Sequence, residues 1–162
     1  GGSSSYGYDV LSRLTQKPFA VSSWRTMNYR PAFRAWGYQT DNYESTGNME
    51  LPDPDQYYAG AVAVLSGTST FSAAEDFLVA FDVMDRGPII GQASGGSTGQ
   101  PLGFYLPGGG VARVTTKRDT YPDGSDFVGA GLQPDILAPT TVKAFIEQRD
   151  LALEAAIRYF SE

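Results

Sequence analysis

The hydrophobic positions of the chain change their period near residue 66, and this change predicts a strand followed by a helix. Residues 60–65 form a continuous apolar run bounded by glycines, which is typical of a strand buried on both faces in a parallel sheet. A loop of small residues occupies 66–71, and apolar residues then recur at helical spacing from Ala74 to Phe81. A buried strand, a tight loop and a helix in this order are typical of an α/β fold.

Weaker patterns predict the remaining elements. They are a short helix at 8–14, a strand within 20–29, a buried strand at 89–91, a hairpin around the turn 107–110, and a helix at 142–160 that is broken near 149–150. Residues 31–56 follow no period and are rich in aromatic residues, Asn, Gly and Pro. We therefore expect an irregular surface insertion at 31–56.

Charge and composition exclude several function classes. The chain has 162 residues, the length of one domain or a large part of one, and a net charge of -6 without a basic run. A nucleic-acid partner is therefore not expected, and no apolar stretch is long enough for a membrane span. The chain contains neither cysteine nor histidine, which excludes disulfides, thiolate or histidine metal sites and a self-contained Ser-His-Asp triad. We expect no metal and no cofactor.

Ser72 is the first candidate functional residue, because it lies between the small-residue loop and the predicted helix. With Glu75 three residues later it forms a capping-box pattern, and most serines in this pattern only satisfy backbone donors. The alternative is a nucleophile, since the helix N-terminus is electropositive and the N–H of Ala73 points to where an oxyanion would form. The leading Gly1-Gly2 is likewise open to two interpretations, a flexible tail or a turn that enters a helix.

Several motifs, in this order, resemble those of the C-terminal processing peptidases, which are tail-specific serine proteases. They are Gly1-Gly2, Phe-Ser-Ala-Ala-Glu at 71–75, Gly95-Gly96, Pro-Asp-Gly at 122–124 and Gly-Ala-Gly-Leu-Gln-Pro-Asp-Ile at 129–136. The resemblance implies a ClpP/crotonase-like β-α spiral of stacked β-β-α units. It also implies that residues 1–162 are the C-terminal part of one catalytic domain, because Gly1-Gly2 resembles the end of the family's Asp-x-Arg-x-Asn-x-Gly-Gly motif.

The resemblance also implies roles for individual residues. Ser72 would be the nucleophile of an acyl-enzyme mechanism, and the N–H groups of Gly2 and Ala73 would form the oxyanion hole. The loop Gly95, Gly96 and Ser97 would lie near the site, with Ser97 where the Ser-Lys dyad enzymes carry lysine. The pattern therefore resembles the tricorn-like and retinoid-binding-protein-like branch, in which the base, a histidine, would come from an upstream segment of the same protein.

Other residues qualify this assignment. Lys17, Lys117 and Lys143 are interpreted as solvated surface lysines rather than bases. Asp126 is either an orienting acid or an exposed carboxylate of the turn after Asp123. The resemblance favours a serine endopeptidase that acts on polypeptides in a bacterial cell envelope, in the periplasm or after secretion. The alternative is a catalytically silent domain of the same fold that binds peptides or apolar ligands.

Overall fold

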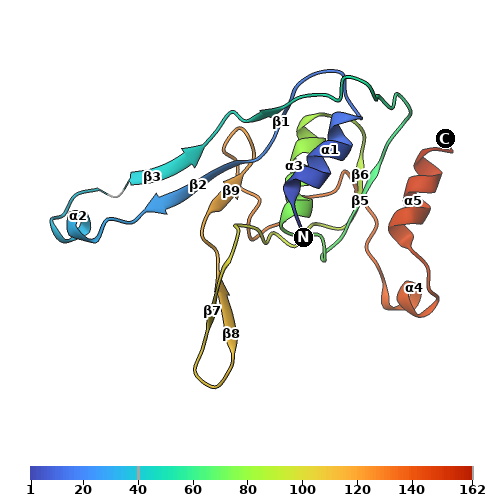
Figure 1. Ribbon diagram of the computed structural model, residues 1–162. Helices are drawn as coiled ribbons and strands as arrows, with labels where there is room; N and C mark the ends of the chain where they lie inside the picture. Colours follow the sequence, from blue (N-terminus) through green and yellow to red (C-terminus); the bar gives the residue numbers. More distant parts are fainter. Residues whose placement is uncertain (40, 162) are drawn as a thin grey trace.

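The computed structural model describes residues 1–39 and 41–161, which form a mixed α/β fold (Figure 1). Three short parallel strands make the central sheet in the order β10–β6–β5. Their bounds are Val64–Ser66 for β5, Ile89–Gly91 for β6 and Ile136–Leu137 for β10. Helix α3, Ala73–Val83, connects β5 to β6, so the predicted order of strand, loop and helix is confirmed.

Strand β6 carries the core on both faces of this sheet. Ile89 belongs to a buried cluster with Phe81 of α3, whereas Ile90 packs with Ala156 of α5, Leu151–Tyr159. Adjacent residues of a strand point to opposite faces, so the two isoleucines pack against two different helices. The sheet is therefore covered by helices on either side, as expected for a parallel sheet.

Strand β5 is less buried than its sequence predicts. It comprises residues 64–66 instead of 60–65, and the side chain of Leu65 is 40% exposed. The prediction of a strand buried on both faces was wrong, because β5 is the edge strand of the described sheet. An edge strand has a neighbour on one side only, and a continuous apolar run does not reveal this position.

Helix α1, Ser4–Ser12, lies beside α3, and Figure 1 shows the two helices side by side. Gly7 permits their close approach, since a Cβ atom at Gly7 would lie 3.3 Å from Cβ of Phe77. Leu11 of α1 is fully buried in the same cluster as the apolar face of α3. The N-terminal residues are thus held against the helix that begins after Ser72.

Further antiparallel strands pair outside the central sheet, and two of them, β2 and β3, form an arm that projects from the body (Figure 1). Their bounds are Phe19–Ala20 for β1, Ser23–Asn28 for β2, Asp41–Ser45 for β3, Met49–Glu50 for β4 and Arg118–Thr120 for β9. A short helix at the tip, α2, spans Pro31–Ala35. The segment 31–56 therefore contains regular structure that we did not expect. Four of the five residues of β3 are exposed, so this strand shows no apolar alternation and is defined by its pairing with β2.

Two predictions near the C-terminal half are confirmed. Strands β7, Leu102–Tyr105, and β8, Val111–Val114, form the expected hairpin. Helix α4, Val142–Ile146, ends before α5 begins, and Asp150 caps α5 by accepting the N–H of Leu153 at 3.0 Å. Among the described residues, no helix is long and apolar enough to cross a membrane.

Candidate active site

Ser72 has a backbone conformation that side-chain-bearing residues seldom adopt. Its φ is 58° and its ψ is -130°, at the junction between the loop after β5 and the first turn of α3. For a residue with a Cβ atom, such a conformation costs about 1–3 kcal/mol and is tolerated where the surrounding structure enforces it. Strained turns of this kind, between a strand and a helix, are where nucleophilic serines are often presented.

The first turn of α3 leaves one backbone donor free next to Ser72. The N–H of Ala74 donates to Phe71 O at 3.3 Å, and that of Glu75 to Ser72 O at 2.7 Å. The N–H of Ala73 has no acceptor among residues 1–39 and 41–161. A free N–H at a helix N-terminus attracts negative charge, because the partial charges of the helix add to its own dipole.

Glu75 connects the serine to the glycine-rich loop. Its side chain is fully buried, and it accepts the N–H of Ser72 at 3.2 Å, which is one half of the predicted capping box. The same carboxylate accepts three donors of residues 94–97, namely Ser94 Oγ at 2.5 Å, Gly96 N at 2.6 Å and Ser97 N at 3.0 Å. A buried carboxylate is costly unless it is hydrogen-bonded, and here four donors surround it.

The glycine-rich loop is also held from its other side. Gly129 N donates to Gly96 O at 2.8 Å, and Leu132 N donates to Ser94 Oγ at 2.8 Å. Gly96 has a φ of +60°, and a Cβ atom there would lie 2.7 Å from the nitrogen of Gly131. The two glycine-containing segments therefore pack backbone against backbone, at a distance that a side chain would prevent.

The backbone of Ser97 completes the contact with the candidate nucleophile. Ser97 O accepts the N–H of Ser72 at 2.8 Å, so the loop and the serine are joined directly as well as through Glu75. Both residues line a pocket of about 430 Å³, together with Gly1, Gly2, Phe71, Thr98, Pro101, Arg113 and Thr115. Three of the residues singled out in the sequence, Gly2, Ser72 and Ser97, thus meet at one pocket.

A buried aspartate of α3 binds the segment that follows Gly1 and Gly2. Asp76, one turn further along α3, accepts Ser4 Oγ at 2.5 Å and Ser22 Oγ at 3.0 Å. A Cβ atom on Gly1 would lie 3.6 Å from the Cβ of Ser72, so the two segments are in contact. Burial is the main cause that raises the pKa of the Tyr8 phenol above its ordinary value, and the negative charge of Asp76 is the second.

Asp126 lies elsewhere. Its carboxylate binds the guanidinium of Arg118, with Nε of Arg118 at 3.0 Å from Oδ1 and a second contact through Nη2. Both side chains are about half exposed, and they line a different pocket, which also contains Asp123. Ser72 does not contribute to that pocket. The structure therefore brings Ser72, Gly2 and Ser97 together and places Asp126 apart from them.

Lys117 is not the solvated surface lysine that we expected. Its Nζ lies 2.6 Å from Oδ1 of the fully buried Asp119, and its side chain is 21% exposed. The Nζ also lies 5.7 Å from the centre of the Trp24 ring. Lys117 directly precedes β9 and Asp119 lies within it, and the ion pair with the buried aspartate holds the lysine inward.

The family of the chain follows from its sequence as a whole. Residues 1–138 match the model of peptidase family S41. The chain belongs to peptidase family S41. This membership confirms the resemblance to the C-terminal processing peptidases, because the match spans the motifs on which the resemblance was based.

Solved structures resemble this S41 chain over most of its length. A protein from Parabacteroides merdae described as a candidate peptidase aligns with a TM-score of 0.72 and 21% identity, over 98% of this chain and 48% of its own. Mature CPAF complexed with lactacystin aligns with a TM-score of 0.73 and 20% identity, over 99% and 40%. The photosystem II D1 C-terminal processing protease aligns with a TM-score of 0.52 and 24% identity, over 86% and 32%.

These alignments support the fold of the S41 chain. The chain spans less than half the length of each of these structures. A search among curated proteins found no significant match.

Sequence reasoning missed two parts of the candidate site. The capping-box spacing predicted only a local role for Glu75. It could not predict the contacts of Glu75 with residues 94–97, because these contacts join segments about twenty residues apart. Arg113 was not singled out either, because its position at the pocket depends on how the hairpin is oriented. One signal was available for Glu75: it is an acidic residue among apolar ones in a helix that packs in the core.

Proposed function

We propose that the protein is a serine endopeptidase whose nucleophile is Ser72. The observation that carries this proposal is the strained conformation of Ser72 at the start of α3, in a residue that also lines a pocket. Strain of this kind persists where the surrounding structure enforces it, and it presents a hydroxyl at the end of a turn. Membership of peptidase family S41 supports the same assignment.

In this proposal, two backbone N–H groups close to Ser72 form the oxyanion hole. The N–H of Ala73 lacks an acceptor among the described residues and lies at the positive end of α3. The N–H of Gly2, at the pocket of Ser72, would be the second donor. Two donors that are already oriented stabilise the oxyanion of a tetrahedral intermediate without reorganisation.

The reaction proceeds through an ester on Ser72. The Ser72 oxygen attacks the carbonyl carbon of the scissile bond while a base takes the hydroxyl proton. The C–N bond then breaks, the base returns the proton to the leaving amine, and an acyl-enzyme remains. Water attacks this ester with the help of the same base, which releases the second product and restores the hydroxyl.

We further propose that the base is a histidine outside these 162 residues, as in the tricorn-like branch. The chain has no histidine, and Ser97 stands where the dyad enzymes carry lysine. Lys117 is ion-paired with Asp119, and an ammonium group has no lone pair with which to accept a proton. Asp126 would have to leave its ion pair with Arg118 before it could orient a base.

The wider assignment follows from the same resemblance. We propose that residues 1–162 form the C-terminal part of one catalytic domain, and that its α/β units continue as a ClpP/crotonase-like spiral. The motifs from Gly1-Gly2 to residues 129–136, in the order given above, support this proposal. We place the proposed substrate, a polypeptide, in a bacterial cell envelope, the periplasm or the extracellular space.

Labelling with a fluorophosphonate probe tests the proposal, because such probes react with activated serines. We expect strong labelling of Ser72 in the intact protein and loss of nearly all labelling in the isolated 162-residue chain, which lacks histidine. A Ser72→Ala variant of the intact protein is the control for the site of labelling. If the intact protein is not labelled, the enzyme assignment is overturned and a silent binding domain is favoured. Strong labelling of the isolated chain would overturn the external base.

The Ser97→Ala variant distinguishes the role of the Ser97 backbone from the role of its hydroxyl. The contacts of Ser97 with Ser72 and Glu75 are made by its backbone C=O and N–H, which alanine retains. A neutral hydroxyl is also a poor base near pH 7. We therefore expect peptide hydrolysis by the intact Ser97→Ala protein to stay within about tenfold of the wild type. A loss as complete as that of Ser72→Ala would assign the Ser97 hydroxyl to the reaction.

A further inference from the structure

One face of the β7–β8 hairpin forms a wall of the Ser72 pocket. Gly103 pairs with Arg113, and Leu102 with Val114, in the antiparallel ladder. Pro101 and Thr115 lie one residue beyond the last of these pairs. Paired residues share a face and successive residues alternate, so Pro101, Gly103, Arg113 and Thr115 are on the same face. Three of these four residues line the pocket of Ser72.

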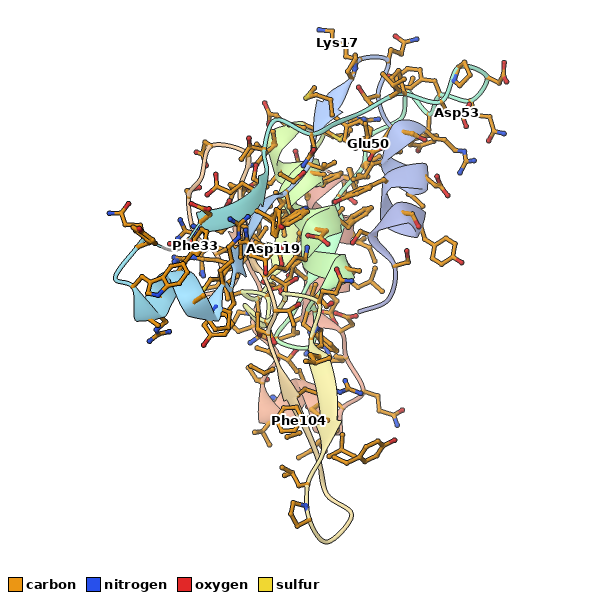
Figure 2. All side chains as sticks on the ribbon, turned by 60° about the vertical axis from the view of Figure 1, so that its left-hand side comes forward. Lys17, Phe33, Glu50, Asp53, Phe104 and Asp119 are labelled. Atoms are coloured by element: carbon orange, nitrogen blue, oxygen red, sulfur yellow. The ribbon has the colours of Figure 1, made fainter. Side chains whose placement is uncertain are left out.

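The hairpin extends away from the body of the molecule. Figure 1 shows it as a projection, and Figure 2 shows Phe104 on it, well away from Asp119 near the centre. Its strands pair with each other and with no other strand of the described residues. The pocket of Ser72 is therefore bounded on one side by a wall that a bound peptide could follow.

Arg113 is the one charged side chain among the residues that line this pocket. It is exposed, and no carboxylate among residues 1–39 and 41–161 forms an ion pair with it. Its partner across the ladder is Gly103, and a Cβ atom at Gly103 would meet nothing within 4 Å. The face beside Arg113 is thus open. The chain has a net charge of -6, yet no acidic side chain of the described residues neutralises this guanidinium.

We infer that Arg113 binds a carboxylate of the peptide substrate beside Ser72. An arginine fork matches the geometry of a carboxylate and can donate two parallel hydrogen bonds to it. The carboxylate is that of an aspartate or glutamate close to the scissile bond, or the C-terminal carboxylate of the substrate. This inference rests on the proposed peptidase function and specifies its substrate class.

The test compares matched peptides with the intact protein. The peptides have equal length and carry Glu or Gln at each position flanking the scissile bond, and each is made as a C-terminal acid and as an amide. We expect the carboxylate form to be cleaved with about tenfold higher kcat/KM, mostly through KM, and the preference to weaken at high salt. Arg113→Gln should abolish this preference, and Arg113→Glu should reverse it.

The preference between Glu and Gln reports a side-chain carboxylate, and the preference between acid and amide reports the C-terminus. Either one, if Arg113→Gln abolishes it, supports the inference. Arg34→Gln removes the same charge from α2 at the tip of the arm and should keep the wild-type preference. Equal thermal unfolding of the two glutamine variants shows that neither effect arises from misfolding. A wild type without preference, or a preference that survives in Arg113→Gln, overturns the inference.

Binding separates this inference from the proposed reaction. Fluorescence anisotropy measures the affinity of the same peptides for Ser72→Ala and for the double variant Ser72→Ala/Arg113→Gln, neither of which needs to cleave them. A carboxylate preference in the first protein that is lost in the second supports Arg113 even if the wild type hydrolyses nothing. If the probe labels Ser72 but neither binding nor cleavage depends on Arg113, the inference fails and the peptidase assignment stands.

Discussion

Replacing Ser72 with alanine in the intact protein is expected to lower kcat for peptide hydrolysis by at least about 10⁴-fold. In the proposed reaction the serine oxygen forms the bond to the acyl group, so no acyl-enzyme can form without it. What would remain is the stabilisation by the proposed oxyanion hole, the N–H groups of Gly2 and Ala73, which could still polarise a carbonyl for attack by water. Hydrolysis of a fluorogenic peptide and capture of the acyl-enzyme by mass spectrometry measure the effect.

A glycine at the same position distinguishes a strained nucleophile from an ordinary cap residue. Alanine retains the Cβ atom and therefore the strain at φ 58°, whereas glycine relieves it. We expect the free energy of unfolding of Ser72→Gly to be about 1 kcal/mol higher than that of Ser72→Ala. Both variants should be inactive. Urea denaturation measures this difference. Equal stabilities would mean that the backbone of Ser72 is unstrained, and substantial activity in either variant would remove Ser72 from the reaction.

Glu75→Gln is expected to lower the free energy of unfolding by about 2–4 kcal/mol. The buried carboxylate accepts donors from Ser72, Ser94, Gly96 and Ser97, and both of its oxygens are used. A glutamine presents an NH₂ group on one side, which turns at least one of these contacts into two donors facing each other. Urea denaturation of the intact protein measures the change in stability.

The same substitution should reduce activity without removing the nucleophile. Glu75 joins Ser72 to the loop of Gly96, so the variant should label more slowly with the fluorophosphonate probe and lose at least about tenfold in kcat. Glu154→Gln is the matched control, because Glu154 of α5 is a half-buried carboxylate that pairs with Arg149 and contacts neither Ser72 nor residues 94–97, so its loss should leave the labelling rate and kcat unchanged. Full stability and activity in Glu75→Gln would show that the loop and the serine are held by other contacts.

Local patterns predicted the elements whose conformation depends on neighbouring residues. The start of α3 after Ser72, the hairpin turn at 107–110 and the break between α4 and α5 were all visible, because caps and turn residues act within a few positions. The motifs of the family were visible for a related reason. Gly96 and Gly131 lie where two backbones touch and a side chain would clash, so this constraint appears in the sequence as glycines within the motifs.

Other features depend on neighbours that lie far away in the chain. Strand β3 forms because β2 supplies its hydrogen bonds, although both of its faces are largely exposed and its residues show no period. The exposure of Leu65 follows from the place of β5 at the edge of the described sheet. Lys117 turns inward because Asp119 is buried beside it. Pattern reasoning reads one segment at a time, and none of these effects is a property of one segment.

The candidate site divides in the same way. Sequence alone determined the nucleophile candidate, the helix dipole behind it and the lack of a histidine base, since these depend on residue type and local spacing. Only the tertiary structure decided that Glu75 binds both Ser72 and the glycine-rich loop, that Asp126 pairs with Arg118 away from the pocket, and that Arg113 lines the same pocket as Ser72. The physical reason is that burial and charge pairing are set by the packing of distant segments, which a local sequence pattern does not encode.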